Sequence, residues 1–241
     1  MKKILSACVI LLSLVALTGL SSCRKVIGQG ATVTEERVLA NFTRLQTSIS
    51  GAVYVSEGPV QQVKIEAQQN IIDIVESTVE NGVLKLKLKS NTMLSNSSQL
   101  KVYITIPKYR EISVMGSGSV KATQSFSSND IDLKVTGSGD IDIDNLVSTN
   151  FYSEITGSGN INVVAGTTQS LVLRITGSGD FYGKDFKSKD AEVTITGSGS
   201  ATVRATNSLK ARISGSGNIN YYGIPTTDVN ITGSGNVRHQ N

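Results

Sequence analysis

The stretch ITGSGNINV, residues 155–163, decides the fold because it recurs with small changes along the second half of the chain. The first glycines of its seven copies are separated by 21, 20, 20, 20, 18 and 18 residues. A nearly fixed period of this length is typical of stacked structural repeats. The other copies are VMGSGSVKA at 114–122, VTGSGDIDI at 135–143, ITGSGDFYG at 175–183, ITGSGSATV at 195–203, ISGSGNINY at 213–221 and ITGSGNVRH at 231–239.

Apolar and polar residues alternate on both sides of each Gly-Ser-Gly triplet, which is the pattern of a strand with one buried face. In the copy at 155–163, Ile155, Ile161 and Val163 are the residues predicted to point inward. Each unit therefore consists of a strand, a tight corner, a second strand and a variable link. Such a unit cannot bury its own apolar face, but a stack of units can.

We predict an all-β fold, a single-stranded parallel β-helix with turns of about 20 residues and Gly-Ser-Gly corners. In such a coil, equivalent residues stack at roughly 4.8 Å. The Asp, Asn and Ser residues that follow the corners would then form one ladder along the outside. A propeller blade needs about 40–50 residues, and an antiparallel meander would tolerate more varied corners than these.

The first 23 residues have the layout of a bacterial export signal. Lys2 and Lys3 precede an apolar run, Ile4–Leu17, and LSSC at 20–23 resembles the lipobox of lipoproteins. That resemblance implies that residues 1–22 are a signal peptide and that Cys23 carries the lipid. We expect an exported protein anchored in the cell envelope, at the outer membrane and exposed at the cell surface. The alternatives are an uncleaved membrane anchor, for which the run is short, and a soluble secreted form.

The mature chain divides into a short polar segment and a β-rich domain. We expect residues 23–36 to be a tether, with a first strand around Ala31–Val38 as the alternative. Residues 37–241 are predicted to form the β-helix domain. Within it, residues 37–115 are irregular first turns or a cap, and residues 116–241 are the regular turns.

Charge and cysteine content argue against several function classes. The chain has 23 Lys+Arg and 19 Asp+Glu, so the loss of Lys2 and Lys3 leaves 21 against 19, a net charge of +2. Nucleic-acid binding would need a basic stripe, so no nucleic-acid partner is expected. Cys8 belongs to the signal and Cys23 to the lipid site, which leaves no thiol for a disulfide or a metal. No cofactor is predicted.

The repeats, the alternating strands and the leader together resemble the head-GIN domain adhesin family. The tripeptides Gly159-Asn160-Ile161 and Gly217-Asn218-Ile219 carry its pattern directly. The resemblance covers about residues 37–241. It implies a right-handed β-helix, which agrees with the general preference of parallel crossovers. It also implies an exported, cell-surface protein, and it implies no catalytic residues.

Five residues of the repeats are the candidates for ligand binding: Asp140, Asp142, Asn160, Asp180 and Tyr182. We predict a non-catalytic adhesin or binding module that offers the ladder faces of its coil to a glycan or a protein. The enzymatic alternative is a glycosidase or lyase. Asp140 and Asp180 lie two turns apart, so about 9–10 Å, near the upper end of the gap in inverting glycosidases. A third alternative is a purely structural envelope protein.

The sequence does not favour a calcium site or catalysis by a histidine. Calcium β-rolls repeat every nine residues with Asp two positions after a glycine, whereas Ile141 stands two positions after Gly139. No metal site is therefore predicted. The sole histidine, His239, lies near the end of the chain, and we expect it to be a solvated tail residue.

The last turn raises a separate question. Only residues 236–241 follow the final Gly-Ser-Gly triplet. A coil that stops there exposes strand edges, which invite pairing with another chain. We therefore predict that a partner, such as a second copy of the chain, covers the C-terminal turn.

Overall fold

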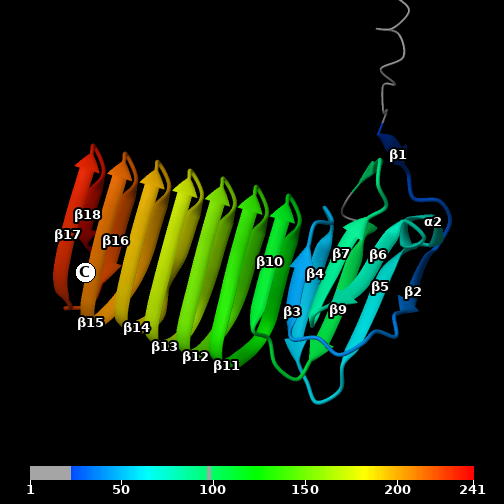
Figure 1. Cartoon of the computed structure of the whole chain (residues 1–241), viewed down its shortest axis with the longest axis horizontal. Helices are drawn as coiled ribbons and strands as arrows, with labels where there is room; N and C mark the ends of the chain where they lie inside the picture. The colour runs from blue at the N-terminus through cyan, green and yellow to red at the C-terminus, as the bar shows by residue number, and fades with distance from the viewer. Residues whose placement is uncertain (1–22, 97–98) are drawn as a thin grey trace, which may run out of the picture.

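The computed structural model describes residues 23–96 and 99–241. The expected signal peptide, residues 1–22, lies outside the described residues. Nearly every element is a β-strand, and most of the chain winds into a parallel coil of about six turns (Figure 1). Within the described residues, no helix has the length and apolar character needed to cross a membrane.

The regular coil contains five long strands, β11 to β15, that each follow the chain around most of a turn, and shorter strands at both of its ends. Its strands are β10 (Glu111–Gly116), β11 (Ser119–Gly137), β12 (Asp140–Gly157), β13 (Asn160–Gly177), β14 (Asp180–Gly197), β15 (Ser200–Gly215), β16 (Asn218–Tyr222), β17 (Thr226–Gly233) and β18 (Asn236–His239). All neighbouring pairs are parallel. Ile141 of β12 pairs with Ile161 of β13, 20 residues later. The predicted all-β parallel coil with Gly-Ser-Gly corners is confirmed.

The corners stack on one another through their backbones. Gly157 has a φ of 121°, which only glycine adopts readily, and its carbonyl accepts hydrogen bonds from the amides of Ser178 (2.8 Å) and Gly179 (3.1 Å). A Cβ at Gly159 would come within 2.0 Å of the carbonyl oxygen of Gly139. The first glycine of each triplet thus makes the bend, and the second, without a Cβ, can lie directly against the preceding turn.

The coil has four outer surfaces. The corner ridge consists of the Gly-Ser-Gly triplets. The pre-turn sheet is the layer of strands that run into the corners, and the post-turn sheet is the layer that leaves them. The link edge, opposite the ridge, contains residues 123–130, 144–150, 164–170, 184–190 and 204–208.

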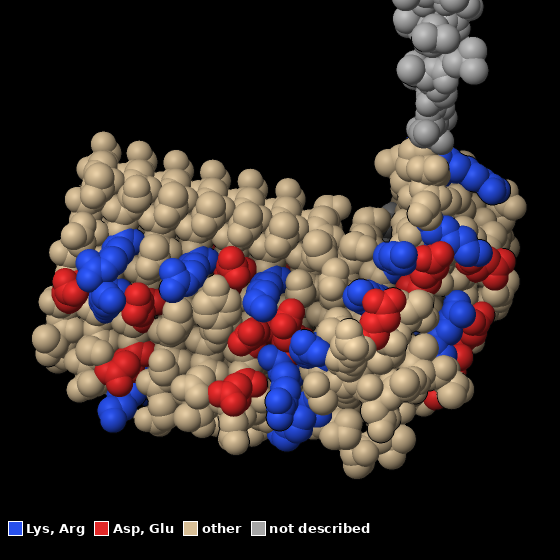
Figure 2. Space-filling model, viewed as in Figure 1, with Lys and Arg blue, Asp and Glu red and all other residues tan. Residues whose placement is uncertain are grey.

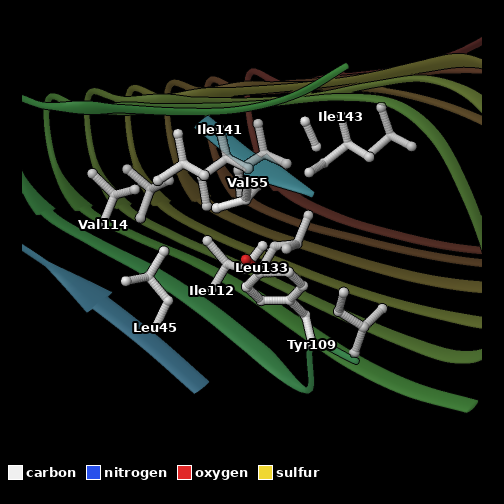
Figure 3. Packing of buried hydrophobic residues seen from close by; sticks show 14 of the residues in the cluster. Leu45, Val55, Tyr109, Ile112, Val114, Leu133, Ile141 and Ile143 are labelled. Atoms are coloured by element: carbon white, nitrogen blue, oxygen red, sulfur yellow. The ribbon is translucent and has the colours of Figure 1, made fainter. Parts of the chain in front are cut away.

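The core is a set of apolar columns that run along the inside of the coil. Ile155, Ile161 and Val163 are buried, as predicted from the alternation. Near the link edge, Phe151 packs edge-to-face on Phe186, with ring centroids 5.4 Å apart. The core continues without a break into the N-terminal part, where Leu45 lies beside the coil residues (Figure 3).

The N-terminal part is both a continuation of the coil and a cap. Its elements are β1 (Arg24–Val26), β2 (Thr32–Glu36), β3 (Arg44–Thr47), β4 (Ala52–Glu57), β5 (Gln62–Gln68), α2 (Gln69–Ile72), β6 (Val75–Glu80), β7 (Val83–Leu88), β8 (Thr92–Leu94) and β9 (Lys101–Ile106). Strand β3 pairs in parallel with β10, and β4 pairs in parallel with β11. The pairs β2–β5, β5–β9 and β6–β7 are antiparallel and close this end.

The segment expected to be a tether is already part of the fold. Strand β2 pairs with β5 from Thr32 to Glu36, so the alternative of a first strand describes this stretch. Strand β1 pairs with β8, and the amide of Arg24 donates to the carbonyl oxygen of Asn91 over 2.7 Å. Backbone hydrogen bonds thus join the chain to the cap from Arg24, the residue after Cys23.

The C-terminal end of the coil is open. Strand β17 pairs with β15, and β18 pairs with β16, and nothing in the described chain lies beyond them. Val229 and Ile231 are 45% and 40% exposed, whereas Ala211 and Ile213, their neighbours one turn earlier, are 0% and 3% exposed. His239 is exposed, but it is not a free tail residue, because its Nε2 lies 2.8 Å from the carbonyl oxygen of Gly223.

Candidate functional site

The residues that follow the corners form a hydrogen-bonded ladder on the post-turn sheet. Asp140, Asn160, Asp180 and Ser200 occupy equivalent positions in β12 to β15. Oδ1 of Asp140 accepts from the amide of Asn160 (3.1 Å), and Oδ1 of Asn160 accepts from the amide of Asp180 (3.2 Å). Oδ1 of Asp180 accepts from the amide of Ser200 (2.7 Å). One oxygen of Asp140, Asn160 and Asp180 thus holds the backbone of the next turn.

A second column lies beside this ladder and completes an open hollow. Its members are Asp142, Asn162 and Tyr182, two residues further along their strands. The hollow, of about 480 Å³, is lined by Asp140, Asp142, Asn160, Asn162 and Tyr182. Four of the five predicted ligand residues therefore meet at one place. The fifth, Asp180, contacts the hollow through Tyr182, whose hydroxyl donates to its Oδ2 over 3.0 Å.

The hollow combines one aromatic ring with carboxylate and amide groups. Partial burial and then the hydrogen bond to Asp180 raise the pKa of Tyr182, so its hydroxyl stays protonated at neutral pH. Tyr182 is 48% exposed, and its ring is a flat apolar group. The Oδ2 atoms of Asp140 and Asp142 are acceptors. The side-chain amide of Asn162 donates to Oδ1 of Asp142 over 3.5 Å and has a second N–H for a ligand.

The residues around the hollow do not form a cluster of metal ligands. Across residues 23–96 and 99–241, no group of three His, Cys, Asp or Glu side chains is close enough together to hold a metal ion. The ladder oxygens of Asp140 and Asp180 already bind backbone amides. The residues present are therefore better suited to hydrogen bonding than to coordination.

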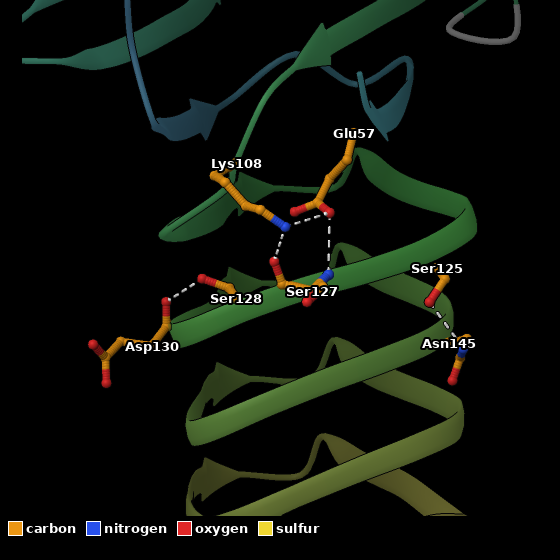
Figure 4. Close-up of polar contacts among 7 residues, drawn as sticks. All are labelled: Glu57, Lys108, Ser125, Ser127, Ser128, Asp130 and Asn145. Atoms are coloured by element: carbon orange, nitrogen blue, oxygen red, sulfur yellow. Dashed lines mark hydrogen bonds and ion pairs between the residues drawn. The ribbon is translucent and has the colours of Figure 1, made fainter. Parts of the chain in front are cut away.

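A second hollow, of about 330 Å³, lies on the link edge where the cap meets the coil. Lys108 forms an ion pair of 3.2 Å with Glu57 and donates to the carbonyl oxygen of Ser127, and the amide of Ser127 donates to the same Glu57 carboxylate over 3.1 Å (Figure 4). Ser128 and Asp130 lie beside them. Lys108 is thus occupied by internal partners, and this cluster fastens the cap to β11.

Comparison with known proteins identifies the family. The sequence profile described as "Putative auto-transporter adhesin, head GIN domain" matches residues 41–225. The chain belongs to this head GIN domain family. The family resemblance predicted from the repeats is confirmed. A search of curated proteins gives no match to the chain.

Solved structures of Bacteroidales proteins share the fold of this head GIN domain. A crystal structure described as a "putative adhesin" from Bacteroides fragilis is 23% identical, has a TM-score of 0.85, and covers 89% of this chain and 100% of its own. A "putative lipid binding protein" from Parabacteroides distasonis is 24% identical, with a TM-score of 0.73 and coverage of 90% and 100%. A second "putative adhesin" from P. distasonis is 22% identical, with a TM-score of 0.71 and coverage of 90% and 100%. At these identities the likeness shows the fold alone.

The pre-turn sheet of the head GIN domain has a different character from the post-turn sheet. Acidic and basic side chains alternate over it, and the ridge above carries neither in this view (Figure 2). The charges pair across neighbouring turns, as Lys134 does with Glu111 (3.4 Å) and Lys210 with Glu192 (3.4 Å). Because these groups neutralise one another, the post-turn sheet is the better candidate for a ligand.

Two groups of surface residues were not predicted from the sequence, one on the post-turn sheet and one on the link edge. Asn162 lines the hollow, and the same alternation that selected Asp142 could have found it, because both are outward residues of one column. The link-edge cluster gave no such signal. Glu57, Lys108 and Ser127 are brought together only by the docking of the cap, and their separation in sequence hides the relationship.

Proposed function

We propose that this head GIN domain is a non-catalytic adhesin that binds a glycan on its post-turn sheet. The observation that carries the proposal is the hollow beside Tyr182, lined by Asp140, Asp142, Asn160 and Asn162. A family of adhesins gives the broad class. The open form of the hollow suits an extended chain that lies across several turns of the coil.

The chemistry of the hollow favours a sugar over an apolar ligand. A pyranose ring has a face of C–H groups that packs on an aromatic ring, and a rim of hydroxyls. Tyr182 offers the ring, and it is held in position by its bond to Asp180. Asp142 and Asn162 lie one turn apart and offer acceptors and donors for neighbouring hydroxyls.

Catalysis by the carboxylates is the weaker interpretation. A glycosidase needs one carboxyl group to give a proton and a second to act on the opposite face of the sugar. Asp140 and Asp180 are separated by Asn160, and each uses an oxygen to bind the amide of the next turn. Their arrangement serves the backbone of the coil and leaves no enclosed site for the reaction.

The proposed lipid at Cys23 sets the orientation of this surface at the envelope. Arg24 directly follows Cys23 and is already bonded in β1, so the lipid would hold the domain close to the bilayer. Strand β1 and the corner ridge lie on the same side of the molecule (Figure 1). The ridge would then face the membrane, both sheets would stand upright, and the link edge would point away from the cell.

The test is a glycan array probed with the chain from residue 23 onward, which contains every described element, with Cys23→Ser to prevent lipidation. Tyr182→Ala should abolish the signal on the glycans that the unchanged chain binds. Tyr152→Ala is the matched control, because Tyr152 also donates to a nearby carboxylate, that of Glu154, but lies on the pre-turn sheet.

Two outcomes would count against the proposal. An array without any bound glycan would remove the ligand class. Equal losses for Tyr182→Ala and Tyr152→Ala, with both variants folded by circular dichroism, would move the binding surface away from the hollow. Protease treatment of intact cells tests the location separately, since a protected domain could not act as an adhesin.

A further inference from the structure

The open C-terminal end exposes the core of the coil. In each turn of the coil, the next turn covers the inward-pointing residues. No turn of the described chain covers β17 and β18, and Val229 and Ile231 are about half exposed. The backbone edge of β17 is open over Thr226–Gly233, and that of β18 over Asn236–His239, within the described chain. Exposed edges and exposed core residues together are the features of an unfinished sheet.

The edge also lacks the charged residues that usually protect such an end. Only Asp228 and Arg238 carry fixed charges on β17 and β18. Asp228 is already paired with Arg212 of the preceding turn at 3.2 Å. A second strand that approaches this end would therefore not be repelled by a group of charges of one sign. At the opposite end, the edge strand β6 carries Glu76 and Glu80, which are paired with Lys87 and Lys85. Charged edges of that kind resist pairing.

We propose that two copies of this chain join through their C-terminal turns and form one continuous coil. Growth in a single direction would need β17 or β18 to pair with an edge strand of another copy's cap, β6 or β2. Strand β2 carries Glu35 and Glu36, so both edges of the cap are charged. Pairing between two identical C-terminal ends leaves neither of them exposed. It closes after two copies, which is the commonest symmetry of protein assemblies.

The chain suggests one register for this contact. Residues 228–232 and 236–240 lie at matching distances on either side of the last corner serine, Ser234. If the corner ridges of the two copies are aligned, β17 lies antiparallel to the second copy's β18. Ile231 then faces Val237, and Val229 faces His239, with every inward residue opposite an inward residue. Outside, Asn230 faces Arg238, and no two like charges meet.

The proposed lipid anchor selects the same register. This step alone depends on the lipidation of Cys23. In this register the two-fold axis is perpendicular to the coil and runs from the link edge to the corner ridge. A rotation about it keeps both copies of β1 on one side of the dimer (Figure 1). The other two-fold arrangement, in which β17 faces β17, would send the two anchors to opposite sides. Only the first arrangement lets both copies enter one membrane.

The contact is large enough to hold two subunits. Five residue pairs on each of the two sheets would add about ten backbone hydrogen bonds, because a residue pair in an antiparallel ladder contributes one on average. A typical stable interface has about ten hydrogen bonds. The burial of Val229, Ile231 and Val237 in both copies adds an apolar centre.

The first test is sedimentation velocity on the Cys23→Ser chain beginning at residue 23. We expect a monomer–dimer transition between about 1 and 100 μM. Val229→Arg should shift the midpoint at least about tenfold upward, because it would bury an unpaired charge. Val164→Arg is the matched control, since Val164 is similarly exposed, at 50%, but lies on the link edge in β13, away from the C-terminal end. It should leave the midpoint unchanged.

Disulfide trapping tests the register without relying on the stability of a variant. A chain with Asn230→Cys is mixed with a chain with Arg238→Cys, both in the Cys23→Ser background. Oxidation should link them only in the mixture, because residues opposite each other in an antiparallel pair have Cα atoms about 4.5–5.5 Å apart. Linkage of Asn230→Cys with itself would overturn the register. A chain that stays monomeric up to about 1 mM would overturn the dimer.

Discussion

Oδ1 of Asp140 accepts two hydrogen bonds from Asn160, one from its backbone amide at 3.1 Å and one from its side-chain Nδ2 at 2.9 Å. The two residues are 20 positions apart and occupy the same place on successive turns. Side chains of this column therefore contribute to the joining of turns, in addition to the backbone ladder. The same column lines the proposed ligand surface. Substitutions in it can therefore be measured for their effect on the stability of the coil and, separately, on glycan binding.

Asp140→Ala should lower the free energy of unfolding by about 1–2 kcal/mol, because it removes both acceptor contacts to Asn160. Asp140→Asn keeps an oxygen acceptor at the same position and should cost less than about 0.5 kcal/mol. Urea unfolding followed by circular dichroism measures both. If the Asn variant lost as much as the Ala variant, the charge of Asp140 would matter more than its hydrogen bonds.

Gly159→Ala should be among the most damaging single changes in the coil. Its Cβ would lie 2.0 Å from the carbonyl oxygen of Gly139, and backbone cannot move away as a flexible side chain can. We expect a loss of about 3 kcal/mol or more in thermal unfolding. Gly82→Ala is the control, since Gly82 has a φ of 72° but open space around it, and it should cost about 1–2 kcal/mol. Similar losses at both sites would argue against close stacking of the corners.

Tyr109 should link the stability of the cap to that of the coil. Its ring stacks on Phe126 of β11 at 5.1 Å, and its buried hydroxyl donates to the carbonyl oxygen of Ile104 in β9 over 3.0 Å. Burial raises the pKa of Tyr109 well above its ordinary value, so the donor keeps its proton. Tyr109→Phe should cost about 1–2 kcal/mol, and Tyr109→Ala about 3–5 kcal/mol. Hydrogen exchange of β9 and β11 should rise together in the Ala variant, and a rise in only one would contradict the link.

Asp190 on the link edge should titrate below its ordinary range. The hydroxyl of Ser208 and the side-chain amide of Asn207 donate to its Oδ1, and these hydrogen bonds lower the pKa from 3.8. Because the pKa is lower in the folded state, the resulting stabilisation is present above about pH 4. It is lost as the pH falls through the folded value. NMR titration should show Ser208→Ala raising the pKa more than Asn207→Ala, and an unchanged pKa in both would refute this explanation.

Cys23→Ala should release the protein from the membrane fraction of its host, and metabolic labelling with a fatty acid should be lost at the same time. Ser22→Ala is the control, because it changes a neighbouring residue without removing the thiol. Release of the Cys23→Ala variant with intact labelling would place the lipid at another residue.

The regular half of the fold could be predicted from sequence because its signal is repeated. A single GSGNI motif says little, but seven Gly-Ser-Gly copies at a nearly constant spacing require one corner and one alternation to serve every turn. The inward direction of Ile155, Ile161 and Val163 followed from that alternation and is observed. The ladder from Asp140 to Ser200 followed as well, because parallel stacking brings equivalent residues together.

The cap could not be predicted in the same way. Strands β2, β5 and β6 occur once each, and their antiparallel pairing depends on contacts between segments without a shared motif. The stretch Thr32–Glu36 is polar and resembles a tether in sequence, yet it is held by β5. For the same reason, the Glu57–Lys108 pair at the link edge became visible only in three dimensions.

The turns also differ in length in an instructive way. The register advances by 20 residues from Asp180 to Ser200 but by only 18 from Ser200 to Asn218, and the irregularities between β14 and β15 fall between Tyr182 and Asp190, on the link edge. Insertions and deletions are thus absorbed on one side of the molecule, while the ridge and both sheets keep their registration. Over evolutionary time, such a chain can change the outline of its link edge residue by residue. It can change the length of the coil only by gaining or losing a whole turn.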